Sequence, residues 1–295
     1  MREPRRRLRL LLVSAALATG ATGRLIAQER WENPVMRAGH AAFGAGRYDE
    51  ALEHYRRQQL DGIRLGLVEN WLPELIETVE RRRALGQLAP ADTHRIGVIS
   101  VRENVEVGAD GARRTRPDVT EEHKALWRTY LASLSRLVET WSNGGLTLAF
   151  HEVDAVATRL AGDTTAPYLA EHLDLERWFA GHVDDLDSYI TFSLTTTAHA
   201  GSDRYPLVSG VVSGPDRGFV GLNPRHDWTI MVHEFFHVIE AVSGIRPMHG
   251  YRDSLRGRIP EWTGATEFDY YRWRYATTLA PRWNRLNYRA RWVAM

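Results

Sequence analysis

The stretch that decides the fold is DWTIMVHEFFHVIEAVSG, residues 227–244. Asp227 is a favoured residue at the start of a helix and Gly244 is common just beyond a helix end, so the pattern predicts a helix between them. Nearly every residue in this helix is apolar, which indicates that it is buried. The exceptions that matter are His233, Glu234, His237 and Glu240. Burying two imidazoles and two carboxylates is costly unless a partner such as a divalent metal compensates them.

The spacing of these polar residues indicates how a metal would bind. His233 and His237 are one helical turn apart and share a face, so both can reach a single ion. Glu234 points to the side, where it can contact a water molecule beside the metal. Neutral imidazoles suit zinc, so we expect one Zn2+ per chain, with Glu234 as general base of a hydrolytic reaction. The alternative is a pair of hydrogen-bonded core histidines without metal.

An HEFFH motif on a buried helix, after mixed strands and a glycine-flanked edge strand, resembles the zincin superfamily of zinc metallopeptidases. The resemblance implies that His233 and His237 bind zinc and that Glu234 is the general base. It also implies that an extended peptide or protein substrate pairs with the edge strand. The residues of that strand are Gly218, Phe219, Val220 and Gly221.

The third zinc ligand must come from beyond the motif. The metzincin pattern has a glycine and then a histidine soon after the motif, but Glu240 and Ser243 stand at those positions. We expect Glu267 to be the ligand, because it opens a predicted helix, which resembles the gluzincins. His249 is the second candidate, since imidazole is a good zinc ligand although this residue lies in a loop. The remaining candidates are Asp269 and Glu261.

Other side chains have possible supporting roles. Glu240 continues the ligand face of the helix and would orient a ligand rather than bind the metal. Tyr270 or Tyr271 would donate a hydrogen bond to the oxyanion of the reaction intermediate, or would be an aromatic core residue. The other His-Glu pair, His151-Glu152, has no second histidine and falls in a predicted strand, so we interpret it as structural.

The order of the predicted elements indicates an α+β domain, zincin-like, with a mixed sheet. Strands are expected at 95–107, 146–156, 188–194 and 217–223, and helices at 121–141, 171–183 and 228–243.

Residues 33–60 precede this domain and predict a helical hairpin that resembles a single tetratricopeptide repeat. Small Gly39 and Ala51 would let the helices approach, Gly46 would form the turn and Tyr55 would fill the gap. Gln58 departs from the repeat, because a small residue is expected there. A further helix over 70–86 would pack beside the hairpin. The segment would be either a helical cap on the main domain or a surface for a protein partner.

The N-terminus predicts a signal peptide over residues 1–27. Five arginines precede a short apolar stretch, 10–18, which is too short to span a bilayer, and small residues follow it. Cleavage is expected after Ala27, or else after Ala18, and the arginine run matches a twin-arginine signal loosely. We therefore expect an exported protein, periplasmic or extracellular, with no stable membrane span after the leader is removed. The absence of cysteine fits a bacterial envelope and excludes thiolate zinc sites.

The 295-residue chain has a formal net charge of +1, so no overall electrostatic bias towards nucleic acid is present. The expected organisation is a leader over 1–27, a helical segment over 28–90 and a metallohydrolase domain over 91–295. A zinc metallopeptidase is the expected activity. The alternatives are a zinc hydrolase of another amide or a glycoconjugate, and a catalytically inactive zincin-like interaction protein.

Overall fold

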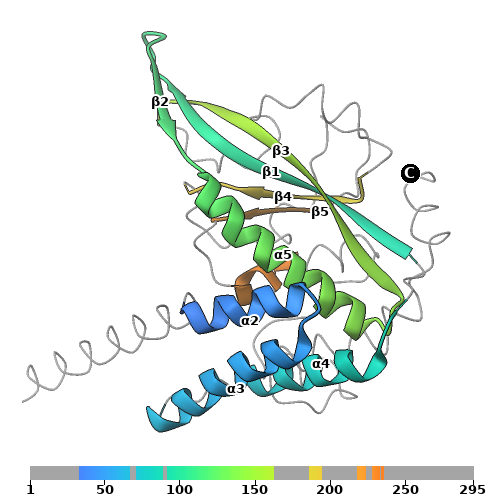
Figure 1. The fold of residues 1–295 in the computed structure, drawn as a ribbon. Coiled ribbons are helices and arrows are strands. Elements are labelled where there is room, and N and C mark those ends of the chain that lie inside the picture. The colour runs from blue at the N-terminus through green and yellow to red at the C-terminus, as the bar shows by residue number, and fades with distance from the viewer. Residues whose placement is uncertain are drawn as a thin grey trace, which may run out of the picture.

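The structure is a computed structural model that describes residues 33–66, 71–88, 92–162, 186–194, 218–223, 228–232 and 234–235, with the backbone alone at 218–220. In these ranges a mixed sheet lies over a group of helices (Figure 1). After the first three helices the described order is two strands, one helix and three strands. The chain is therefore mixed α and β, which is compatible with the predicted α+β class.

The predicted helical hairpin is present as α2 (Pro34–Gly44) and α3 (Tyr48–Arg64). Gly46 turns the chain with a φ of +77°, which residues with a Cβ rarely adopt. A Cβ added to Gly39 would lie 2.5 Å from Cε1 of Tyr55, so the close approach of the helices requires glycine. Gln58 is buried, and its Oε1 accepts a hydrogen bond of 2.7 Å from the Nδ2 of Asn33. That contact accounts for a large polar residue at the position where the repeat has a small one.

Two further helices complete this layer. α4 (Leu72–Leu85) forms where a helix was predicted and packs against α3. α5 (Glu121–Trp141) has the predicted bounds and packs against both α2 and β3. Its first turn is capped by Thr120, whose side chain accepts a hydrogen bond from the backbone N–H of His123. It ends before Asn143, a residue with a positive φ of 51°.

The sheet is built around β1 (Asp92–Val107). β3 (Leu146–Leu160) runs parallel to β1 along its whole length. β4 (Ser188–Phe192) is parallel to the first half of β1, and β5 (Gly218–Leu222) is parallel to β4. All four strands form where the sequence predicts strands.

β2 (Arg113–Pro117) was not predicted. It pairs antiparallel with the second half of β1, with Val107 opposite Arg113. All five of its residues are exposed, so no alternation of apolar and polar residues marks it as a strand. A turn at Gly111, with a φ of +77°, connects it to β1 and is the one local signal of the hairpin.

The hydrophobic core is continuous between the helices and one face of the sheet. Side chains alternate along β1, so Ile96 and Val98 face the helices while Ile99 and Val101 are buried outside this cluster. From the helical hairpin, the core includes Phe43, Ala51 and Tyr55. The N-terminal helices and the sheet therefore share one core.

Some predicted elements lie outside the described residues. These are the helix at 171–183 and the part of the motif helix beyond residue 235. None of the helices in the described ranges is long and apolar enough to cross a membrane.

Candidate active site

The start of the predicted helix is helical at residues 228–232 and 234–235, and we call this segment the motif helix (orange in Figure 1). One side of it packs into the core through Trp228, Met231, Val232 and Phe235, which are 1–3% exposed. Thr229 and Ile230 are only half-buried. Ile230 nonetheless packs against the core, so the described part of this helix is mostly buried. The turn has one fully buried face, because the core and the sheet cover one side.

Glu234 is the one residue of the HEFFH motif with a carboxylate, and its side chain is 2% exposed. It lies in a helical turn whose described neighbours Val232 and Phe235 are buried and apolar. Removing an ionised carboxylate from water costs several kcal/mol unless hydrogen bonds or a positive charge compensate it. A buried glutamate in an apolar helix is therefore a candidate functional residue.

The first turn of the motif helix contacts the N-terminal hairpin through Trp228. The indole ring lies over the imidazole of His40 in α2, with centroids 4.5 Å apart and an interplanar angle of 32°. The Nδ1 of His40 lies 2.9 Å from the hydroxyl of Tyr55 in α3 and 3.4 Å from Oγ of Ser133 in α5. Burial lowers the pKa of His40 to about 3, so this histidine is neutral at ordinary pH.

A second buried histidine contacts the motif helix from the sheet. The ring of His94, in β1, is 6.0 Å from that of Phe235 in an edge-to-face arrangement. Its Nε2 lies 2.7 Å from Oγ of Ser188 in β4. Burial lowers the pKa of His94 to about 3, with a smaller opposing effect from Asp92. Since His94 contacts a core-facing residue of the motif helix, its role is in packing that helix onto the sheet.

Neither His40 nor His94 was singled out from the sequence. For His94 a signal existed, because it alternates with Ile96 and Val98 on one face of β1. For His40 no local signal could identify the partner, since Trp228 is far away in the chain.

A buried aspartate, Asp118, follows the carboxyl end of β2 and lies beside the second half of β1 and the carboxyl end of β4. The Oδ2 of Asp118 accepts hydrogen bonds from Nδ2 of Asn104 (2.6 Å) and Oγ of Ser193 (2.5 Å), and its Oδ1 accepts one from the backbone N–H of Leu194 (2.6 Å). The side chain of Asn223 donates to the carbonyl of Leu194 at 3.1 Å. These bonds fix the carboxyl end of β5, which precedes the motif helix in the sequence. The sequence did not identify Asp118, because its donors come from distant segments.

β5 contains the predicted substrate-pairing strand, Gly218, Phe219, Val220 and Gly221. Among the strands that the structure describes, β5 pairs with β4 alone. One edge of its backbone thus has no neighbour among the described strands. A peptide that pairs with β5 would need such an edge.

The other predicted site residues fall outside the described residues. They are the zinc ligands His233, His237, Glu267 and His249, their alternatives Asp269 and Glu261, and Glu240, Tyr270 and Tyr271. Within the described ranges, no group of three metal-binding side chains is present. His151 is exposed, and Glu152 forms an ion pair of 2.6 Å with Arg128, which agrees with a structural role for that pair.

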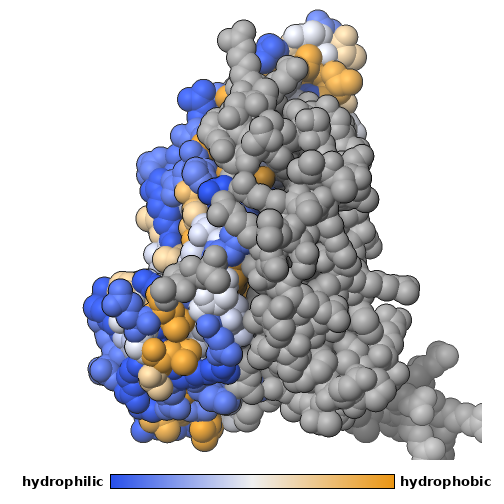
Figure 2. Space-filling view, turned by 90° about the vertical axis from the view of Figure 1, so that its right-hand side faces the viewer, coloured by the Kyte–Doolittle hydropathy of each residue, from blue (hydrophilic) through white to orange (hydrophobic). Residues whose placement is uncertain are grey.

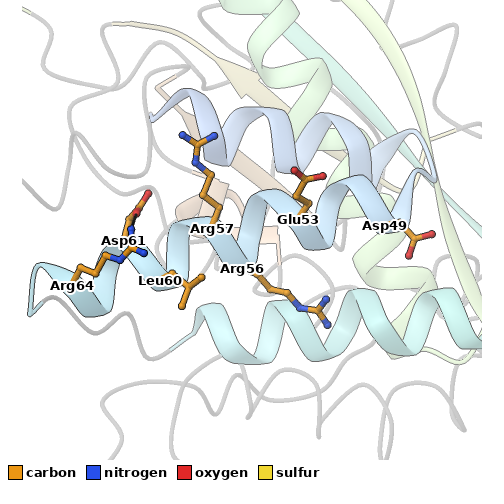
Figure 3. A pocket seen from close by; sticks show the side chains of 7 residues that line it. All are labelled: Asp49, Glu53, Arg56, Arg57, Leu60, Asp61 and Arg64. Carbon is orange, nitrogen blue, oxygen red and sulfur yellow. Dashed lines mark ion pairs between the residues drawn. The ribbon is translucent and has the colours of Figure 1, made fainter.

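The outer side of α3 carries an open groove of about 590 Å³ (Figure 3). Its lining contains both charges and one leucine, namely Asp49, Glu53, Arg56, Arg57, Leu60, Asp61 and Arg64. Leu60, Ile63 and Leu65, at the end of the same helix, are 55%, 61% and 67% exposed. Apolar patches also interrupt the charged surface in the space-filling view (Figure 2). Exposed side chains therefore lie at the end of the predicted 33–60 surface and just beyond it.

No family model matches the chain, and neither a curated protein nor a solved structure matches it.

Proposed function

We propose that the chain is a zinc-dependent metallopeptidase with a zincin-like active site on the motif helix. One observation carries the proposal: the first turn of this helix buries one side and leaves Thr229 and Ile230 half-buried. His233 follows Thr229 by four residues and Ile230 by three, and His237 follows Ile230 by seven. In a helix that continues through the motif, both histidines would lie on this less buried face. A catalytic metal site needs such a face, because one coordination position must remain open to substrate.

The donor set fits zinc. His233 and His237 would bind it through neutral imidazole, with Glu267 as the first candidate for third ligand, His249 as the second, and Asp269 or Glu261 as alternatives. Glu234, at 2% exposure, would lie close to the bound ion, and a nearby positive charge favours the ionised form of a buried carboxylate. Bound zinc would supply Lewis acidity and lower the pKa of a water molecule towards neutrality.

Glu234 would take the proton of the attacking water on a carboxylate oxygen and later transfer it to the leaving amine. Glu240 would orient a ligand by a hydrogen bond. Tyr270 or Tyr271 would stabilise the oxyanion, and β5 would hold the peptide backbone in an extended conformation.

The predicted leader, residues 1–27, supports a site of action outside the cytoplasm. The same water chemistry would also serve a hydrolase of another amide or of a glycoconjugate.

Two measurements test the proposal. Purified mature protein should contain one zinc per chain by plasma emission spectroscopy, and His233→Ala and His237→Ala should each lose it, because two ligands cannot retain the ion. Wild-type protein should cleave members of a random peptide library. Full zinc content without any peptide cleavage would instead favour the other hydrolases, and a metal-free wild-type protein would refute the zinc site.

A second candidate function, partner binding without catalysis, is favoured by the groove on α3 and the exposed Leu60. In that case a metal-free, inactive protein should bind a peptide from the same library. Leu60→Asp should abolish this binding. Leu160→Asp, at a residue 68% exposed at the end of β3, is the matched control and should leave it intact.

A further inference from the structure

We propose that His40 is a positioning residue for the proposed active site, because it fixes the first turn of the helix that carries the zinc-binding motif. The proposal rests on the proposed function only for its catalytic consequence. The positioning of residues 228–235 by a side chain from the N-terminal hairpin can be tested without any activity.

Three helices hold the His40 ring in place. It belongs to α2, and its Nδ1 contacts the Tyr55 hydroxyl of α3 and the Ser133 hydroxyl of α5 at 2.9 and 3.4 Å. Tyr130 of α5 adds an edge-to-face contact with ring centroids 5.6 Å apart. Tyr55 is itself confined, because its ring packs directly against Gly39. The orientation of His40 is therefore determined by groups on separate, rigid elements.

The fixed ring in turn locates Trp228. The two rings are 4.5 Å apart, and both residues are 1% exposed. Trp71, at the start of α4, contacts Trp228 from another direction with ring centroids 6.4 Å apart. These contacts therefore fix the position of the described part of the motif helix at Trp228. His233 follows Trp228 by five residues in the sequence.

A histidine serves this purpose better than an apolar residue of similar size. Its Nδ1 forms a hydrogen bond with the buried Tyr55 hydroxyl, and its neutral ring still packs against indole. Burial keeps the pKa of His40 near 3, so the arrangement persists at the pH where a zinc hydrolase works. The N-terminal hairpin is then part of the active-site scaffold, whatever else binds to its outer side.

His40→Ala tests the inference, and Ile99→Ala is the control. Ile99 is fully buried in β1 but belongs to the opposite face of the sheet, outside the cluster that contains Trp228. Hydrogen exchange, followed by mass spectrometry on the full mature protein, should show faster exchange of residues 228–235 in His40→Ala. Ile99→Ala should not show this local effect when the two variants are compared under conditions equally far from their own unfolding midpoints.

The catalytic consequence has its own readout. Zinc affinity, measured by chelator competition, should fall roughly 10-fold in His40→Ala, as it does when groups that orient metal ligands are removed. The kcat should fall while KM stays close to wild type, and Ile99→Ala should change neither. Tyr55→Phe keeps the ring but removes the hydroxyl, so it should show the same local exchange effect, more weakly, and remains informative if His40→Ala does not fold.

Equal exchange of residues 228–235 in the His40 and Ile99 variants, with Tyr55→Phe like wild type, would overturn the positioning role. If wild-type protein binds no zinc, the proposed function fails, but the exchange experiment still decides whether His40 positions the helix.

Discussion

Arg82 of α4 and Glu139 of α5 form an ion pair in the interior, with Nη2 and Oε2 3.6 Å apart and side chains only 5% and 9% exposed. Arg82 also donates to the carbonyl of Gly86 and lies over the ring of Tyr48, with its Cζ 5.4 Å from the centroid. The pair therefore connects two helices of the core. Removing one partner would leave a buried charge with less compensation, which costs free energy.

Arg82→Ala should lower the free energy of unfolding by about 3 kcal/mol, because it leaves a buried glutamate with less compensation. The effect should not be larger, since Arg136 also pairs with Glu139 at 2.8 Å. Arg83→Ala is the matched control. Its pair with Asp49 is at the surface, with side chains 49% and 84% exposed, and should contribute at most about 1 kcal/mol. Urea unfolding measures both, and equal losses would contradict the assigned burial of the Arg82 pair.

Stability should decrease as the solution is acidified below neutral pH. His40 and His94 have pKa values near 3 in the folded protein, whereas an unfolded histidine has a value of 6.5. The unfolded chain therefore binds protons first, so the stabilisation is complete above about pH 6.5 and is lost progressively as the pH falls towards 3. Between pH 7 and pH 5 the loss should be about 2 kcal/mol for each histidine.

Urea titrations at several pH values measure this dependence. In His40→Ala, the slope of the free energy of unfolding against pH should be smaller by the equivalent of about one proton. This difference is about 1.4 kcal/mol per pH unit. An unchanged slope in that variant would show that His40 is not buried in neutral form.

Glu234→Gln should retain zinc and the fold but lose catalysis. The amide fills nearly the same space but cannot accept the water proton, and general-base catalysis is typically worth about 10²–10⁴-fold. The measurement is turnover of a cleaved library peptide at saturating zinc. A variant with more than about a tenth of the wild-type rate would rule out the general-base role.

The third ligand is tested by comparing Glu267→Ala with His249→Ala in a chelator titration. We expect the Glu267 variant to release zinc at lower chelator concentration, because a ligand on a helix is held more rigidly than one in a loop. The His249 variant should behave like wild type. The reverse order would replace the gluzincin-like ligand set with three histidines.

Export predicts that mature protein from its native host begins near Gln28, or near Thr19 if cleavage follows Ala18. N-terminal sequencing of the fractionated protein measures this. Protein that begins at Met1 or Arg2 and is found in the cytoplasm would contradict an exported location.

Local rules were sufficient for much of the fold. Apolar periodicity gave α5 its predicted bounds, and Gly46 gave the turn of the hairpin. β2 was missed because its residues are all exposed and carry no periodicity. Backbone pairing with β1 stabilises this strand, and such pairing does not require a particular pattern of side chains.

Some features of the candidate site could likewise be predicted from the local sequence, and others could not. The burial of Glu234 and a helix at its position follow from the local sequence, and the described residues 228–232 and 234–235 agree with both. The contact between His40 and Trp228 could not be predicted, because it joins residues that only the tertiary fold brings together. The acceptor role of Asp118 depends likewise on donors from β1 and from the end of β4.

The pairing of β1 has a consequence for how the protein acquires its structure. Asp92 pairs with Leu146, and Ile96 pairs with Ser188, so the first half of the central strand depends on partners that are synthesised much later. Sheets dominated by such distant pairings fold slowly, because loop closure must precede the gain from contacts. During synthesis the strand remains without its neighbours while residues 1–27, which we propose to be a leader, have already emerged. A translocation pathway that requires an unfolded chain would thus have time to engage this protein before its central sheet forms.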